Sequence, residues 1–321
     1  MVLTMGILRE IYDGRVSHNA LSAPFVENPH LKVSILHMVN QTVPLMGGMI
    51  RATEKYGDSR TMNETAYNVA MDTDKPFFEY LRAHPDLESE FDSYMQSQAL
   101  VYPSTSVENL LRGFDWNSLP GGAVIVDVGG GSGSASITVA KEHPNLRFVV
   151  QDQEVPIKNA KSKIAELPKE MAQRIGLQEH DFFKEQPVKG ADIYLLRTIL
   201  HDWPDAEAVK ILRRLVQAMK PTSRILIMDM VLPVPNSGSS IFEAALRQKD
   251  LAMFLTFNAK ERETSDWYDL IQQADARLSI RAIRRPEGCQ HSVIEVVIDN
   301  ERSNGVDSVT LDGKTVAERS T

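Results

Sequence analysis

The chain has 321 residues, of which 42% are apolar and 24% are charged, and this composition is typical of a globular protein of about two domains. Its 35 basic and 43 acidic residues give a formal net charge of −8, which argues against a general nucleic-acid or membrane-surface binder. The single cysteine, Cys289, excludes an internal disulfide and favours a reducing compartment. The opening residues lack a signal-peptide pattern and no apolar run approaches the roughly 18 residues of a membrane helix, so we expect a cytoplasmic protein.

The first part of the chain has helical periodicity. Apolar residues recur at three- and four-residue spacings over 31–55 and again over 75–100, with few β-branched runs between them. The segment 113–122, GFDWNSLPGG, has the composition of a turn and indicates a domain boundary. We therefore predict a smaller, all-helical N-terminal part over residues 1–114.

Residues 115–300 alternate short apolar runs with amphipathic segments. Runs of this length, rich in Val and Ile, are typical of strands buried on both faces. An amphipathic helix is expected over 205–219, with Pro204 just before its start. The alternation predicts an α/β fold with a doubly wound, mostly parallel sheet. The expected strands are 123–128, 147–151, 192–196, 224–231 and 292–298. The last residues, 301–321, contain no aromatic residue and no Ile, and we expect a flexible tail there.

A glycine-rich turn gives the strongest local signal. The sequence VDVGGGSGS (126–134) joins a predicted strand to a predicted helix, and glycines let the backbone turn sharply and let a ligand approach its peptide groups. Asp152 follows the next strand, where a carboxylate can accept both hydroxyls of a ribose. Ser134 stands where a dinucleotide fingerprint has its last glycine, and Asp127 before the loop suits a cationic ligand end better than a pyrophosphate. These features favour S-adenosylmethionine over NAD.

Further polar residues fall at the ends of successive strands. Asp181 and Phe182 lie in LQEHDFF (177–183), just after what looks like a further strand, the third in chain order, and suit an adenine ring by a hydrogen bond and a ring contact. His201 follows the fourth strand, and Asp229 lies at the end of the fifth. Ligands of open α/β sheets bind beyond the carboxyl ends of the strands, so these residues are expected to gather at one edge. This coincidence predicts an enzyme.

His201 is the candidate general base because an unperturbed imidazole titrates near neutral pH. Its neighbours Asp202 and Asp205 suit helix capping, and Trp203 suits packing. No cluster of three oxygen ligands accompanies His201, so no Mg²⁺ is expected.

The set of motifs resembles class I S-adenosylmethionine-dependent O-methyltransferases of the caffeate and flavonoid type, and is nearest to fungal secondary-metabolism members. The motifs are VDVGGGSGS, QDQ (151–153), HDFF (180–183), LHDWPD (200–205), MDMVLPVP (228–235) and AKERE (259–263). The resemblance implies a Rossmann-like fold, S-adenosylmethionine as cofactor with S-adenosylhomocysteine as product, and metal-independent methylation of a phenolic or polyketide hydroxyl on a small aromatic substrate.

The resemblance also implies residue roles. His201 would be the catalytic base, with Asp229 and Glu261 as the acids that flank and orient it. The implied cofactor-binding residues are Asp127, Gly129, Gly130, Gly131, Gly133, Asp152, Asp181, Phe182 and Arg197.

The sequence departs from the family at two places. Relatives begin with a winged-helix region that packs two subunits together, whereas this chain opens at about the last strand of that region. The expected homodimer, and the part of the substrate pocket that its partner would supply, depend on that region. The usual Ala-Gly-Phe after the final helix reads Ala274-Asp275-Ala276, and losing a capping glycine predicts a modest stability cost.

Three other functions remain open at the sequence level. The fold also hosts proteins that hold S-adenosylmethionine and catalyse dehydration or pericyclic steps. A truncated, non-catalytic pathway subunit and an NAD-dependent reductase are further alternatives. The presence of His201 together with Asp229 and Glu261 favours methyl transfer.

Overall fold

The computed structural model describes residues 3–101, 103–235, 237, 240–299, 308–311 and 314–317. The chain divides into two compact units. The first comprises the residues up to Pro103 together with Leu255–Phe257, and the second comprises the rest of the chain from Ser104. Within the described residues, no helix combines the length and apolarity that crossing a membrane requires.

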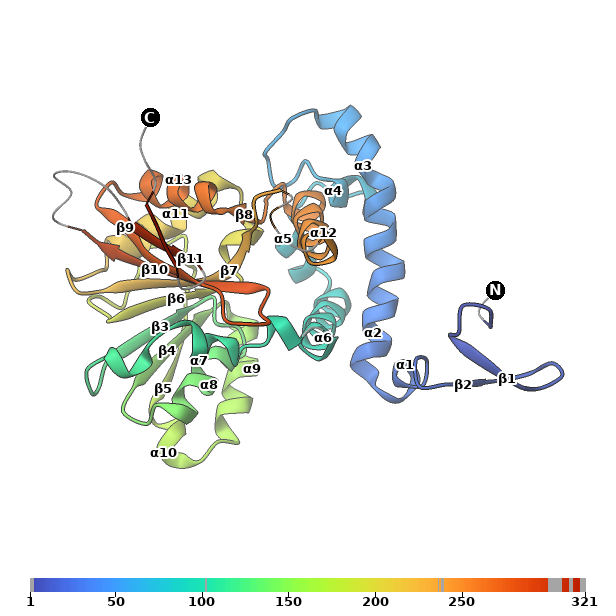
Figure 1. Ribbon diagram of the computed structural model, residues 1–321, viewed down its shortest axis with the longest axis horizontal. Helices are drawn as coiled ribbons and strands as arrows, with labels where there is room; N and C mark the ends of the chain where they lie inside the picture. The colour runs from blue at the N-terminus through green and yellow to red at the C-terminus, as the bar shows by residue number, and fades with distance from the viewer. Residues whose placement is uncertain are drawn as a thin grey trace. The chain divides into compact units, whose positions relative to one another are not determined.

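The first unit is mostly helical, but it opens with an antiparallel hairpin, which agrees with the strand that the resemblance places at the start of the chain and not with an all-helical part. In this hairpin β1 (Leu8–Tyr12) pairs with β2 (Arg15–His18) (Figure 1). Aromatic rings fill the core of the unit, and the ring of Phe77 lies edge-on to those of Tyr67 and Phe91. The helices are α1 (Pro24–Glu27), α2 (Pro29–His37), the π-helical η1 (Met38–Thr42), α3 (Val43–Tyr56), α4 (Ala66–Ala70), α5 (Phe77–Arg82) and α6 (Pro85–Val101).

The described residues of the second unit form an eight-stranded, mostly parallel sheet. The order is β5-β4-β3-β6-β7-β10-β9, and the short β8 pairs with β7. All neighbours are parallel except β10, which runs antiparallel to both β7 and β9. This is the doubly wound fold class that the sequence predicts, and each of the five expected strands is present. The strands are β3 (Val124–Val128), β4 (Arg147–Asp152), β5 (Ile175–Glu179), β6 (Ile193–Arg197), β7 (Arg224–Leu232), β8 (Arg262–Glu263), β9 (Leu278–Arg284) and β10 (His291–Ile298).

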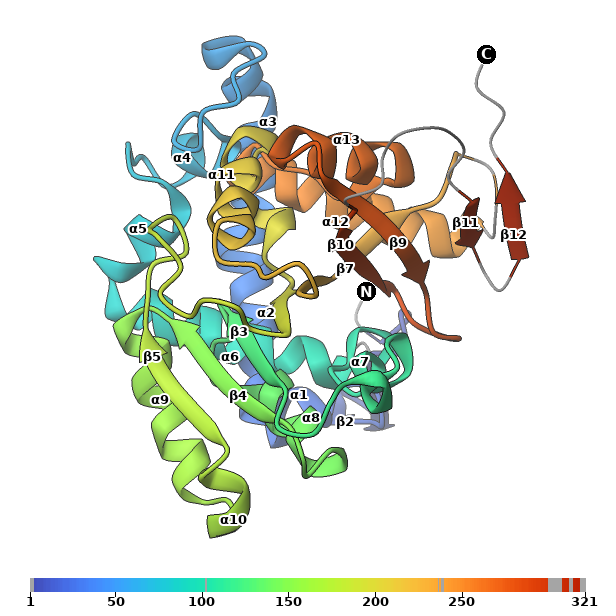
Figure 2. The same cartoon turned by 90° about the vertical axis from the view of Figure 1, so that its left-hand side faces the viewer.

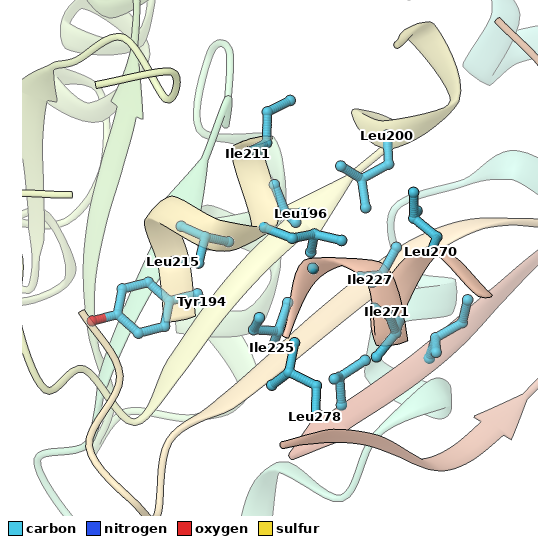
Figure 3. Packing of buried hydrophobic residues seen from close by; sticks show 14 of the residues in the cluster. Tyr194, Leu196, Leu200, Ile211, Leu215, Ile225, Ile227, Leu270, Ile271 and Leu278 are labelled. Carbon is cyan, nitrogen blue, oxygen red and sulfur yellow. The ribbon is translucent and has the colours of Figure 1, made fainter. Parts of the chain in front are cut away.

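Helices cover both faces of this sheet because its strands are apolar on both faces. Alternate residues of β6 point to opposite faces of the sheet. Tyr194 and Leu196 pack with α11 and α13, in the cluster that Figure 3 shows. Ile193 and Leu195 pack with α7 and α8 on the other face. Figure 2 shows the same sheet after a turn of 90° about the vertical axis of Figure 1. The helices are η2 (Pro103–Thr105), α7 (Asn109–Gly113), η3 (Trp116–Ser118), α8 (Ser134–Glu142), α9 (Glu154–Ala165), α10 (Lys169–Ala172), η4 (Leu200–Asp202), α11 (Asp205–Val216), α12 (Ser240–Phe257) and α13 (Thr264–Ala274).

The division between the units falls before residue 104, whereas the turn composition at 113–122 indicates a boundary near 115. Packing explains the difference. Leu110 and Phe114 are buried in the core of the second unit, and a Cβ at Gly113 would lie 2.2 Å from Cγ2 of Val293. The segment 104–114 therefore packs against the sheet through its apolar side chains. Turn composition alone does not reveal this packing.

Two expectations concern the end of the chain. Asp275, where the resemblance implies a helix-capping glycine, has extended backbone with φ −160°, and its Oδ1 accepts the Arg277 N–H at 2.9 Å. The extended backbone requires no left-handed residue at this position, so the structure gives no conformational reason for a cost of losing a glycine. Of the expected flexible tail, 301–321, the described residues form an antiparallel hairpin of β11 (Ser308–Leu311) and β12 (Lys314–Ala317), and the others lie outside the described part of the chain.

Candidate active site

The glycine-rich turn lies at the carboxyl end of β3 and leads into α8. Gly129 and Gly131 have φ of +68° and +57°, which side chains rarely adopt. A Cβ at Gly129 would lie 2.6 Å from Cδ1 of Ile199, so this position also lacks room for a side chain. A Cβ at Gly131 would meet nothing within 4 Å, so the backbone is open on that side. The turn therefore offers free peptide surface to a ligand.

Two acidic side chains hold this turn in place. The Asp127 carboxylate is only 1% exposed and accepts hydrogen bonds from the backbone and hydroxyl of Ser136, at 3.3 and 2.7 Å. Burial raises the pKa of Asp127. Asp152, at the end of β4, accepts the Gly131 N–H at 2.8 Å. Asp127 thus fixes the turn through the helix that follows it. Asp152 contacts the rim of the turn directly, where the ribose acceptor was predicted.

The remaining cofactor candidates lie on neighbouring loops. The Asp181 Oδ1 accepts the Phe183 N–H at 3.0 Å, and the ring of Phe182 is perpendicular to that of Trp203. Phe182 also reaches the glycine turn, because its Cε1 would lie 3.5 Å from a Cβ at Gly129.

Arg197, the last residue of β6, contributes a cation to this edge. Its Nη2 donates to the Thr105 carbonyl at 3.3 Å, and its Nε is buried without a hydrogen-bond partner among the described residues. Burial lowers the pKa of Arg197, and the carboxylates of Asp127 and Asp229 oppose this effect. An open glycine turn, a rim carboxylate and a buried, unsatisfied donor suit the amino-acid and ribose ends of S-adenosylmethionine.

His201 lies in η4, directly after the loop that follows β6, and carboxylates surround its ring. Nδ1 lies 2.9 Å from Oε1 of Glu261 and 4.0 Å from Oδ1 of Asp229. Nε2 lies 3.5 Å from Oδ1 of Asp202. The side chains of Asp229 and Glu261 are fully buried, while those of His201 and Asp202 are 14% and 18% exposed. The structure thus brings the three predicted catalytic residues together.

The charges of this group perturb one another strongly. Burial alone would lower the pKa of His201, but Asp202, Glu261 and Asp229 raise it to about 10. Burial raises the pKa of Asp229 to about 7 and that of Asp202 to about 6, while the charge of His201 opposes both shifts. The imidazolium and its carboxylates therefore stabilise one another in a site that excludes most water.

A buried arginine positions the segment that carries Glu261. The Arg262 side chain is 0% exposed and donates to the carbonyls of Leu200 and Trp203, at 2.7 and 2.9 Å. The Glu261 N–H donates to Oδ1 of Asp250 in α12. These bonds fix Glu261 relative to the His201 turn.

Sequence reasoning missed several of these roles. Asp202, expected as a helix cap, instead faces the His201 ring, and Asp205 pairs with Arg262 at 2.8 Å. The signal for Arg262 was its place in AKERE beside Glu261, but nothing in the sequence links it to the His201 turn. Within the described ranges, no group of three or more His, Cys, Asp or Glu side chains is arranged to hold a metal ion.

Comparison with known proteins identifies the family. The family model of the O-methyltransferase domain matches residues 53–276 of this chain. The O-methyltransferase fsr2 of Gibberella fujikuroi is 54% identical over 299 residues, which are 93% of this chain and 77% of that protein. The chain belongs to the O-methyltransferase family.

Solved structures of two members of this fold superpose on most of the chain. The neocarzinostatin O-methyltransferase NcsB1, in complex with S-adenosyl-L-homocysteine and 1,4-dihydroxy-2-naphthoic acid, gives a TM-score of 0.71 at 25% identity, over 92% of this chain and 82% of its own. A pericyclic reaction enzyme gives a TM-score of 0.74 at 25% identity, over 93% of this chain and 74% of its own. The predicted family, the enzyme class and S-adenosylmethionine as the cofactor of this O-methyltransferase are confirmed.

Proposed function

We propose that this O-methyltransferase methylates a phenolic or polyketide-type hydroxyl of a small aromatic molecule in secondary metabolism, with His201 as the general base and no metal ion. The observation that carries the proposal is the 2.9 Å contact of His201 Nδ1 with Glu261, at the same sheet edge as the glycine turn. The aromatic ligand bound by NcsB1 supports the substrate class.

The cofactor site follows from the residues around the glycine turn. When bound, S-adenosylmethionine supplies an electrophilic methyl group on a sulfonium. The turn at Gly129–Gly133, which is open at Gly131, and the unsatisfied Nε of Arg197 would hold its amino-acid end. Asp152 would accept the ribose hydroxyls, and Asp181 with Phe182 would contact the adenine.

His201 prepares the substrate oxygen. If its Nδ1–H donates to Glu261, the tautomer leaves Nε2 as the proton acceptor. A phenol has a pKa of about 10, so it is a weak nucleophile while protonated. The raised pKa of His201 matches that value, and the proton can therefore be shared between oxygen and nitrogen at little cost. The resulting imidazolium is stabilised by Glu261 and Asp229.

The protonation state sets a condition on turnover. Because the carboxylates raise the pKa of His201, its ring carries a proton at neutral pH in the resting enzyme. The base acts only after that proton has left, so activity should increase with pH up to the alkaline range. The chain supplies both the base and the charges that stabilise it, which is why we propose chemistry without a metal.

Assembly and location complete the proposal. We infer a cytoplasmic protein from its charge and cysteine content. We infer a homodimer from the first unit, where apolar side chains such as Val39, Val43 and Ile50 are 58%, 61% and 67% exposed. The helical N-terminal part would serve dimerisation and substrate capping, and the second unit would bind the cofactor.

Product analysis tests the proposed function. The protein is incubated with S-adenosylmethionine labelled in its methyl group and with a panel of phenols and naphthols. We expect one methyl ether for each S-adenosylhomocysteine formed. Cofactor binding by calorimetry without any labelled product would contradict the proposal.

A second candidate function follows from the likeness to the pericyclic reaction enzyme. That function would consume a substrate without releasing S-adenosylhomocysteine. The same experiment therefore separates the two, because only methyl transfer converts the cofactor.

A further inference from the structure

A second histidine lies at the sheet edge that carries His201, and the mechanism above does not use it. His291 begins β10 and pairs with Met230 of β7, one position beyond the pair of Ser292 and Asp229. Because β10 runs antiparallel to β7, its first residue lies at the carboxyl end of β7. The register therefore places His291 next to the strand end that supplies Asp229.

The side chain of His291 lies on the face of the sheet that α12 covers. Directly paired residues on neighbouring strands point to the same face. Met230, the partner of His291, packs with Leu232 and with Leu246 of α12. Lys249 follows Leu246 on the same helix and is partly buried. His291 and Lys249 are thus directed to one side of the site.

The imidazole of His291 is buried and unsatisfied. Its side chain is 4% exposed, and its Nδ1 has no hydrogen-bond partner in the described part of the chain. Burial above all, and then the charges of Arg197, His201 and Lys249, lower the pKa of His291 well below its ordinary value. A neutral ring with an unsatisfied, buried nitrogen requires an explanation, because such atoms are normally hydrogen-bonded. A bound ligand would provide the missing partner.

We propose that His291 donates a hydrogen bond to a carbonyl oxygen that stands beside the reacting hydroxyl, so that the enzyme selects hydroxyaryl carbonyl compounds among phenols. The proposal rests on the proposed function and names the substrate class for that site.

The charge around His291 favours a carbonyl as its partner. A neutral imidazole carries one N–H donor, and the cations Arg197 and Lys249 nearby favour an electron-rich acceptor over a second donor. A hydroxyl beside a carbonyl also binds that carbonyl internally. His291 would replace this internal bond at the carbonyl oxygen and leave the hydroxyl free for His201. The two imidazoles would then hold two adjacent oxygens, one as donor and one as base.

Two matched probes test the proposal. The probes are 1-naphthol and 1-hydroxy-2-acetonaphthone, which differ in the neighbouring carbonyl group. Their dissociation constants are measured by calorimetry in the presence of S-adenosylhomocysteine, and their methylation is measured by label transfer. The variants are His291→Phe, which removes the donor, and His291→Asn, whose amide N–H lies close to the position of imidazole Nδ1. His291→Leu, which also lacks a donor, serves as the second donor-deficient variant if His291→Phe does not fold.

We expect the wild type to bind the hydroxyketone about 10-fold more tightly than the naphthol. His291→Phe or His291→Leu should remove this preference, His291→Asn should retain most of it, and affinity for S-adenosylhomocysteine should not change. Equal binding of the two probes by the wild type, or an equal loss for both in the variants, would overturn the proposal. A preference that depends on His291 without methylation of either probe would uphold the role of His291 and contradict the proposed function.

Discussion

Replacing Glu261 by Gln tests the electrostatic origin of the base. Glu261 contributes both the 2.9 Å hydrogen bond to Nδ1 and one of the charges that raise the pKa of His201 from 6.5 to about 10. That rise corresponds to stabilisation of the imidazolium on the order of 5 kcal/mol. An adjacent opposite charge accounts for about 1–3 pKa units, so the pKa of His201 should drop by roughly 1–2 units in the variant.

The direction of the pH dependence follows from the raised pKa of His201. A histidine with a raised pKa is protonated, and inactive as a base, until the pH passes that pKa. In the wild type, kcat/KM should therefore increase up to about pH 10. In Glu261→Gln the ascending limb should move roughly 1–2 pH units lower. The plateau should be lower as well, because a less basic imidazole is a weaker acceptor and a neutral amide stabilises the imidazolium less.

The assay is kcat/KM for one phenol between pH 6 and pH 11, with methyl-label transfer as readout. Glu185→Gln is the control, because the Glu185 side chain is 75% exposed and forms an ion pair with Lys189. Its profile should coincide with that of the wild type. An ascending limb that stays in place or moves to higher pH in Glu261→Gln would refute the account.

Three further predictions concern stability and binding. Arg262→Met should lower the free energy of unfolding by about 3 kcal/mol, because the carbonyls of Leu200 and Trp203 lose their donor, and equal denaturant midpoints would contradict this. Asp275→Gly should lower stability by roughly 1 kcal/mol, since the extended backbone needs no glycine and the Arg277 contacts are lost; a higher melting temperature would contradict it. Asp152→Ala should weaken S-adenosylmethionine binding by about 10-fold or more in calorimetry, because it removes both the brace on Gly131 and the proposed ribose acceptor, and an unchanged dissociation constant would remove Asp152 from the site.

The sheet was predictable because its strands are short, apolar on both faces and separated by amphipathic helices. The glycine turn and His201 were predictable for a related reason, since parallel strands bring their carboxyl ends to one edge. Glu261 could be placed only through the resemblance to the family. It lies on the short segment before β8, far along the chain from His201, and no local pattern relates the two.

Other features depend on contacts that periodicity does not encode. The residues that form the hairpin of β1 and β2 show no strong alternation of apolar and polar side chains, and these side chains are mostly exposed. The role of Asp202 depends on how η4 turns its carboxylate toward Nε2 of His201, although its sequence context is that of a helix cap. His291 is one of eight histidines, and only the register of β10 against β7 brings it to the strand end beside Asp229.

The central claim is that His201 removes the proton of the substrate hydroxyl. It is tested most directly by comparing wild type and His201→Ala on two phenols, one protonated at the assay pH and one already ionised. The account predicts that His201→Ala loses about 10²- to 10⁴-fold in rate with the protonated phenol and much less with the ionised one. Equal losses with both phenols, or wild-type turnover with the protonated one, would contradict it.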